Sequence, residues 1–253
     1  NQFHSVVWFP LILLFYQKYI TGKGAGYLLG VALLLAFQVL VGGPESAVLS
    51  VLVIYFHSLC FESGGHYLKK TVHILLVVIL SLGISAIQWV PTYQFLKHLT
   101  RGEGINFSYS TESSLAPRSV ADMLLPENSQ RFFDVKKAEE KSFIKSIYMG
   151  LISCFILLMG VLRFRKDLFV RFWMTLFFVG IFFSLGKYNP VYFYFHSWVP
   201  LFDLFRFPQK FFFLSAFALV FLCGRGLDQL AEDLSERNIG WKVPLLLLVV
   251  LAA

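Results

Sequence analysis

Apolar runs of about 18 residues recur along this chain, and they limit its fold more than any other feature. A helix of that length crosses the hydrocarbon core of a bilayer, which is about 30 Å thick. Hydrophobic residues make up 57% of the chain and charged residues 15%, whereas a soluble domain is roughly 25% charged. With a mean hydropathy of +0.67, the sequence predicts a membrane protein.

The predicted fold is all-α, a polytopic membrane bundle of about eight transmembrane helices with an extracytoplasmic loop region. Residues 1–91 are predicted to hold four helices, residues 92–145 the extracytoplasmic region, and residues 146–253 four more helices. The expected runs are 5–20, 25–41, one ending near 60, 71–91, 146–162, 168–185, 211–224 and one beginning at 243. We interpret the chain as part of a longer protein, because it begins at Asn1 and ends inside an apolar run.

Lysine and arginine side chains indicate the orientation, because cytoplasmic loops of membrane proteins are enriched in them. One set of loops contains Lys18, Lys23, Lys69, Lys70, Arg163, Arg165, Lys166, Arg225, Arg237 and Lys242, and this set is predicted to be cytoplasmic. The segment 92–145 and an aromatic loop, 187–210, then share the outer side. The cations of segment 92–145 count against this orientation, although long loops obey the rule poorly. The net charge of +7 is thus assigned to loops, and no nucleic-acid-binding motif accompanies it.

Local patterns predict structure in the outer segment. Residues 105–110 alternate apolar and polar side chains, which is typical of an extended segment. Residues 117–125 fit a short interfacial helix that begins near Pro117. Lysines at 137, 141 and 145 would form one stripe on a helix, either a solvated face or a site for lipid phosphate.

Small and polar residues inside the runs are mostly assigned to packing. Gly22, Gly26 and Gly30 are four apart and predict a face for close helix packing. The three cysteines are predicted to pack as small apolar residues, and no metal site is expected, because their spacing fits neither zinc nor a redox pair. His57 and His73 are expected to be hydrogen-bonded. Glu45 follows a Gly-Gly-Pro turn and is either a first-turn carboxylate at a helix start or a functional acid.

The stretch 202–210 is the main candidate site. It contains Asp203, Arg206 and Lys210 between two long apolar runs, where a membrane would meet water. Arg206 is suited to gripping a phosphate with two hydrogen bonds, and Lys210 provides a point charge about one helical turn away. Asp203 is placed to orient Arg206. The alternative is ordinary interfacial anchoring, since cations beside aromatic residues are common at membrane helix ends.

The order of several short motifs resembles the bacterial YfhO-like membrane proteins, which belong to the GT-C superfamily of membrane glycosyltransferases. These motifs are Gln38-Val-Leu-Val-Gly-Gly-Pro-Glu45, Ile87-Gln-Trp-Val-Pro-Thr92 with Arg101 further on, Tyr148-Met-Gly-Leu151, Leu185-Gly186, and Val199-Pro200 leading to Phe205-Arg-Phe-Pro208. Together they span about Gln38 to Leu230.

The resemblance implies a multi-pass enzyme of the bacterial cytoplasmic membrane. Such an enzyme transfers a sugar from a polyprenyl-phosphate carrier to a cell-envelope glycan or polymer, without a cofactor. The family's carboxylate base would lie in an outer loop upstream of Asn1, with Glu45 as a second acid. Arg206 and Lys210, and less strongly Arg101, are then expected to bind the donor phosphate, since fixed cations stabilise a charged leaving group.

Two other functions remain open. A transporter or flippase for a lipid-linked glycan would also need cations and an outer vestibule, and is expected to place ionisable residues at mid-membrane. The charges of this sequence lie mostly at the ends of its apolar runs, which favours the enzyme. The third function is a non-catalytic membrane scaffold.

Overall fold

The computed structural model describes residues 2–62, 67–96, 106–124, 144, 146–199, 202 and 205–235. These residues form helices and no strand, which confirms the predicted all-helical class. The chain divides into two compact units, Asn1–Glu103 and Gly104–Ala253. Their boundary falls inside the polar segment 92–145.

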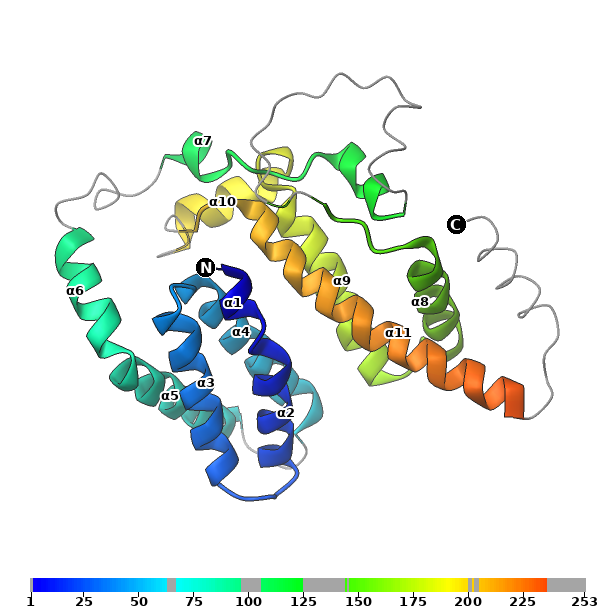
Figure 1. The fold of residues 1–253 in the computed structure, drawn as a ribbon, viewed down its shortest axis with the longest axis horizontal. Helices are drawn as coiled ribbons and strands as arrows, with labels where there is room; N and C mark the ends of the chain where they lie inside the picture. Colours follow the sequence, from blue (N-terminus) through cyan, green and yellow to red (C-terminus); the bar gives the residue numbers. More distant parts are fainter. Residues whose placement is uncertain are drawn as a thin grey trace. The chain divides into compact units, whose positions relative to one another are not determined.

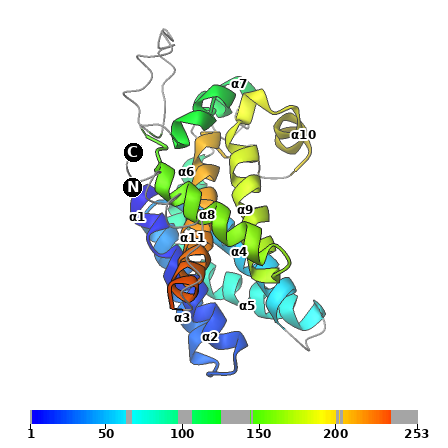
Figure 2. The same cartoon turned by 90° about the vertical axis from the view of Figure 1, so that its right-hand side faces the viewer.

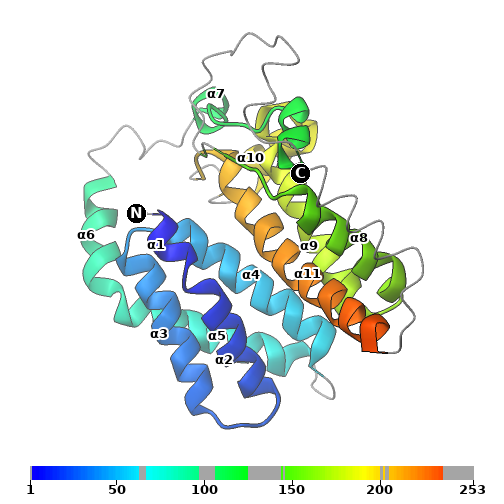
Figure 3. The ribbon, with the colours of Figure 1, turned by 45° about the vertical axis from the view of Figure 1, so that its right-hand side comes forward.

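The first unit is a helical bundle. Its elements are α1 (Gln2–Val6), α2 (Phe9–Ile20), α3 (Gly26–Leu40), α4 (Pro44–Phe61), α5 (Tyr67–Ile84) and α6 (Ala86–Leu96). Figures 1 and 3 show α2 and α3 side by side. The core takes one fully buried aliphatic residue from each of four helices: Ile12, Val31, Ile54 and Val77.

Two of the runs expected as single helices are each divided into two. The run 5–20 breaks between Val6 and Phe9, and Pro10 lies in the first turn of α2, where its missing N–H costs nothing. The run 71–91 breaks at Ser85, whose hydroxyl donates to the carbonyl of Ser81 (2.8 Å). Such a bond inside a helix competes with the backbone ladder and favours a bend.

The second unit contains three longer helices and a group of short ones. Its elements are α7 (Phe107–Ser110), η1 (Pro117–Met123), α8 (Leu151–Phe164), α9 (Leu168–Ser184), η3 (Gly186–Tyr188), α10 (Pro190–Trp198), η5 (Pro208–Phe211) and α11 (Phe212–Ser235). Helices α9 and α11 run antiparallel and lie side by side in Figures 1 and 3. Trp173 of α9 is 2% exposed and stacks on Phe221 of α11, with ring centroids 4.0 Å apart.

Glycines allow the helices of the second unit to approach closely. A Cβ added to Gly160 of α8 would lie 2.8 Å from the backbone nitrogen of Gly226 in α11. One added to Gly180 of α9 would lie 2.8 Å from the nitrogen of Ser215. The close-packing face predicted in the first unit is confirmed only at Gly30, which faces the ring of Phe15, and is wrong for Gly22 and Gly26, whose surroundings are open.

Helices α7 and α10 lie together at one end of the second unit (Figure 2). The prediction of an extended segment at 105–110 is wrong for its described part, because Phe107–Ser110 is helical. The side chain of Asn106 caps this turn by accepting from the backbone N–H of Ser108 (3.3 Å), so local hydrogen bonds override the alternation. The short helix expected at 117–125 forms as the 3₁₀ helix η1.

Three described helices are long and apolar enough to cross a membrane: Pro44–Phe61, Tyr67–Ile84 and Pro208–Glu232. Three shorter apolar helices accompany them: α3, α8 and α9. The count of about eight spans stays a prediction, and both the run from 243 and the lysine stripe lie outside the described residues. The charged segment expected from Arg225 onward continues α11 to Ser235, since Arg225 and Asp228 can pair along the helix (3.8 Å).

Candidate functional site

The predicted site loop is held against the last residue of α7 and the segment that follows it. Phe207 donates its backbone N–H to the carbonyl of Ser110 (3.0 Å), and the Ser110 hydroxyl donates to the carbonyl of Phe205 (3.2 Å). Gln209 donates its N–H to the carbonyl of Ser113 (3.3 Å). These hydrogen bonds join segment 92–145 to segment 187–210. The charge pattern predicts that both segments lie on the outer side.

Phe207 has an unusual backbone conformation. Its φ is +66°, and within the described part of the chain it is the one non-glycine residue in the left-handed region. For an L-residue this conformation costs roughly 1–2 kcal/mol. The following Pro208 also disfavours the right-handed helical conformation at this position. The hydrogen bond to Ser110 holds the turn, and strained residues of this kind gather at functional sites.

Arg206 lies between two aromatic rings and an acid. Its guanidinium carbon is 3.8 Å from the centroid of the Tyr109 ring and 4.2 Å from that of Phe207. One terminal nitrogen donates to Glu112 at 2.9 Å. The side chain is 19% exposed, and its Nε is buried without a hydrogen-bond partner among the described residues. The planar guanidinium is thus fixed by stacking and by one ion pair. Some of its N–H groups, including that of Nε, have no acceptor among the described residues.

Lys210 brings a second cation to the same ring. Its Nζ lies 5.4 Å from the centroid of Phe207. Arg206 lies two residues before η5, and Lys210 lies within it, where η5 leads into α11. Because the start of a helix carries partial positive charge, the two cations add to a local field that favours an anion. Both cations contact the same aromatic ring, that of Phe207, at the strained turn.

The structure brings together part of the predicted site. Arg206 and Lys210 are neighbours as expected, while Asp203 and Arg101 lie outside the described residues. The carboxylate found beside Arg206 is Glu112, which the sequence analysis did not single out. It lies 94 positions away in the chain, and no local motif distinguishes it from the other acids of segment 92–145.

Glu45 belongs to the first unit and is separate from these contacts along the chain. It lies in the first turn of α4 and is half-buried. An acid in that position stabilises the positive end of the helix, while a functional role for Glu45 stays a prediction.

A buried lysine in the first unit has a structural role. Lys70 is 4% exposed, and its Nζ donates to the carbonyls of Ser58 (3.1 Å) and Glu62 (2.6 Å). These carbonyls belong to the last turn and C-cap of α4, where the backbone lacks helical partners. Lys70 was expected in a loop, but it lies in the first turns of α5 because its amino group caps α4.

His73 lies with a ring nitrogen 2.9 Å from the hydroxyl of Tyr19, so it is hydrogen-bonded as predicted. Among the described residues, no group of three or more His, Cys, Asp or Glu side chains could hold a metal ion.

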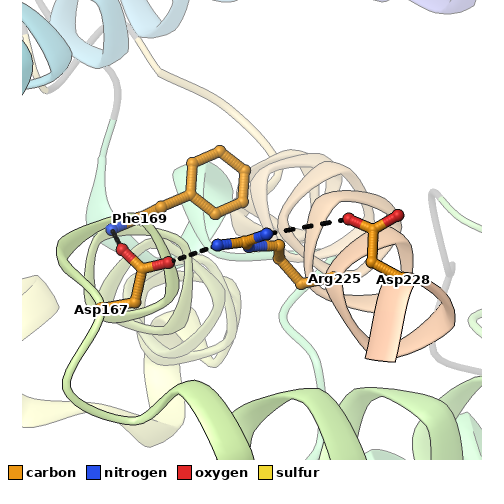
Figure 4. A network of polar contacts seen from close by, with 4 residues as sticks. All are labelled: Asp167, Phe169, Arg225 and Asp228. Carbon is orange, nitrogen blue, oxygen red and sulfur yellow. Dashed lines mark hydrogen bonds and ion pairs between the residues drawn. The ribbon is translucent and has the colours of Figure 1, made fainter. Parts of the chain in front are cut away.

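A second ion pair joins the start of α9 to the middle of α11. Arg225 donates to Asp167 at 2.8 Å and approaches Asp228, as Figure 4 shows. Asp167 also caps α9 by accepting from the N–H of Phe169 (3.0 Å). The hydrogen bond from Arg225 holds the pKa of the Asp167 carboxyl below its usual value. This pair resembles that of Arg206 in chemistry but joins two long helices.

Comparison of the chain with protein-family models, with curated proteins and with solved structures finds no match. Function is therefore inferred from the residues themselves and from the resemblance of the sequence motifs.

Proposed function

We propose that this chain is part of a multi-pass glycosyltransferase of the bacterial cytoplasmic membrane. It would move a sugar from a polyprenyl-phosphate carrier to a cell-envelope acceptor on the outer side. Three helices of membrane length support the membrane location. The proposed reaction and the GT-C relationship come from the resemblance carried by the sequence motifs.

The observation that carries the proposal is the pair of cations on one strained turn. Arg206 and Lys210 both contact the Phe207 ring, at the start of a helix of 25 residues that is long enough to cross a membrane. That position corresponds to the depth of lipid phosphates if the helix spans the bilayer. Arginine provides a planar fork for phosphate oxygens, and the helix start adds a favourable field.

The proposed sugar transfer requires stabilisation of the leaving phosphate and removal of a proton from the acceptor. The bond between the sugar carbon and the carrier phosphate oxygen breaks, and the acceptor oxygen forms a new bond to that carbon. The carrier leaves as a charged phosphate, which Arg206 and Lys210 would stabilise without proton transfer. Glu112, which pairs with Arg206, would help to orient it, and the orienting role of Asp203 stays a prediction. A carboxylate base must remove the acceptor proton.

The test uses membranes that contain the full-length protein. A radiolabelled polyprenyl-phosphate sugar is supplied, and label is followed into the acceptor fraction for the wild type, Arg206→Ala and Lys210→Ala. Arg225→Ala is the matched control, because Arg225 also has an ion pair and contacts an aromatic ring, with its carbon 4.8 Å from the Phe164 centroid. We expect both site variants to accumulate normally and lose transfer, while the control keeps it.

Two results would contradict this proposal. Equal loss of transfer in Arg225→Ala would mean that any broken ion pair in this unit disables the protein. Label that crosses the bilayer while still attached to its carrier would identify a flippase, and the cations would then belong to a gate.

A further inference from the structure

The short helix α10 lies in the connection between α9 and α11. Because α9 and α11 are antiparallel, the chain leaves α9 at Ser184 and enters η5 at Pro208 at the same end of the pair. The pair of Asp167 and Arg225 lies at the opposite end of α9. Helix α10 lies in this connection, so it is placed where these two apolar helices end (Figures 1 and 2).

One face of α10 is fixed to the ends of α9 and α11. Tyr192 is fully buried, and its ring centroid lies 6.4 Å from that of Phe183 in α9 and 6.5 Å from that of Phe211 in η5. Asn189 caps the helix by accepting from the N–H of Val191 (3.0 Å), and Pro190 forms its first turn. Helix α10 is therefore a rigid part of this end of the unit.

The other face of α10 is exposed and strongly aromatic. The most exposed large side chains of α10 and the preceding turn are Tyr188, Phe193, Tyr194 and Trp198, with 43%, 49%, 54% and 79% of their surface accessible. Helix α5, which has membrane length, differs because its exposed side chains from Val72 onward are aliphatic. They are Val72, Leu75, Leu76, Ile79, Leu80, Leu82 and Ile84.

This difference matches the two zones of a bilayer. Aliphatic side chains suit the hydrocarbon core, whereas Tyr and Trp concentrate at headgroup level, because they combine an apolar ring with a polar tip. A cation accompanies the aromatic face of the connection, since Lys187 Nζ lies 5.1 Å from the centroid of the Tyr188 ring. Lysine at this depth can reach lipid phosphates while its stem covers apolar surface.

We infer that α10 is an interfacial helix whose exposed aromatic face inserts into the headgroup region of the bilayer, seated by Tyr188, Tyr194 and Trp198. The partner is a phospholipid surface, since α10 continues directly from apolar helices and faces away from their packed side. The contact between Phe107 and the rings of Phe193 and His196 then joins this helix to α7, next to Tyr109 and Arg206. The inference depends on the proposed membrane crossing but not on sugar transfer.

Tryptophan fluorescence tests this seating in the full-length protein. The protein is placed in vesicles of ordinary phosphatidylcholine, or of phosphatidylcholine brominated near the carboxyl or near the methyl end of its acyl chains. The emission lost on Trp198→Phe is the emission of Trp198. Trp173→Phe is the matched control, because Trp173 is enclosed between α9 and α11.

We expect the emission of Trp198 to be quenched by brominated lipid, and more by bromine near the carboxyl end than near the methyl end. The emission of Trp173 should be quenched less by either lipid. Emission from Trp198 that is red-shifted as in water and insensitive to bromine would overturn the inference. Blue-shifted emission that no brominated lipid quenches would also overturn it, because protein would then cover this face. Neither result depends on the transferase assay, so the two proposals can fail separately.

Discussion

At the scale of single residues, the strained backbone of Phe207 is the feature that organises the candidate site. Its ring contacts both cations, and its left-handed conformation is held by the hydrogen bond to Ser110. Glycine would adopt this conformation without strain, whereas phenylalanine adds a ring. The contacts of that ring with Arg206 and Lys210 are favourable interactions that offset part of the strain.

Substituting Phe207 separates the effect of the backbone from that of the ring. Both Phe207→Ala and Phe207→Gly remove the ring, but only alanine keeps the left-handed strain. We expect the glycine variant to be more stable than the alanine variant by about 1 kcal/mol. Thermal unfolding of the two full-length variants in the same detergent measures this difference. A more stable alanine variant would show that residue 207 is not left-handed.

At the scale of elements, backbone contact between helices determines how the second unit packs. Gly160 and Gly180 let α8 and α9 approach α11 closely, and the Ser215 hydroxyl donates to the carbonyl of Phe177 (2.8 Å). Small residues at such crossings are typical of membrane helices, because lipid offers no hydrophobic drive for their association. The stack of Trp173 on Phe221 adds contact along the same pair of helices.

Alanine substitutions test the closest of these crossings. Gly160→Ala places a Cβ at 2.8–3.1 Å from backbone atoms of α11, so the helices must separate. We expect a loss of about 1–3 kcal/mol in unfolding free energy. Gly224→Ala is the control on α11, because nothing lies within 4 Å of its added Cβ. It should be neutral or stabilise the helix by about 0.5–1 kcal/mol. Equal stability of both variants in a denaturant titration would refute the close crossing.

At the scale of the whole molecule, the charge pattern predicts which ends of the helices face the cytoplasm. Arg165 lies in the turn before α9, and Lys187 lies in η3 after it. The 17 residues of α9 therefore separate these two positions along the helix axis. Both side chains are exposed. An orientation with segment 187–210 outside therefore makes opposite predictions for these two positions.

Cysteine labelling of intact cells measures this orientation. Cys60, Cys154 and Cys223 are first replaced, and a single cysteine is then introduced at Lys187 or at Arg165. A membrane-impermeant thiol reagent should label Lys187→Cys in intact cells, and Arg165→Cys only after the membrane is opened. Labelling in the reverse pattern would invert the topology, and labelling of both positions in intact cells would exclude a membrane crossing by α9.

The sequence by itself determined the helical class, the apolar segments and the neighbouring cations, since these depend on local composition and spacing. Tertiary structure decided the glycine crossings and the pairing of Arg206 with Glu112, because these arise from contacts between residues far apart in the chain, as between Ser110 and Phe207. The break at Ser85 and the helical turn after Asn106 depend on local hydrogen bonds that the apolar and alternating patterns do not reveal. The aromatic face of α10 shows both contributions, because its residues are visible in the sequence but only packing decides which of them are exposed.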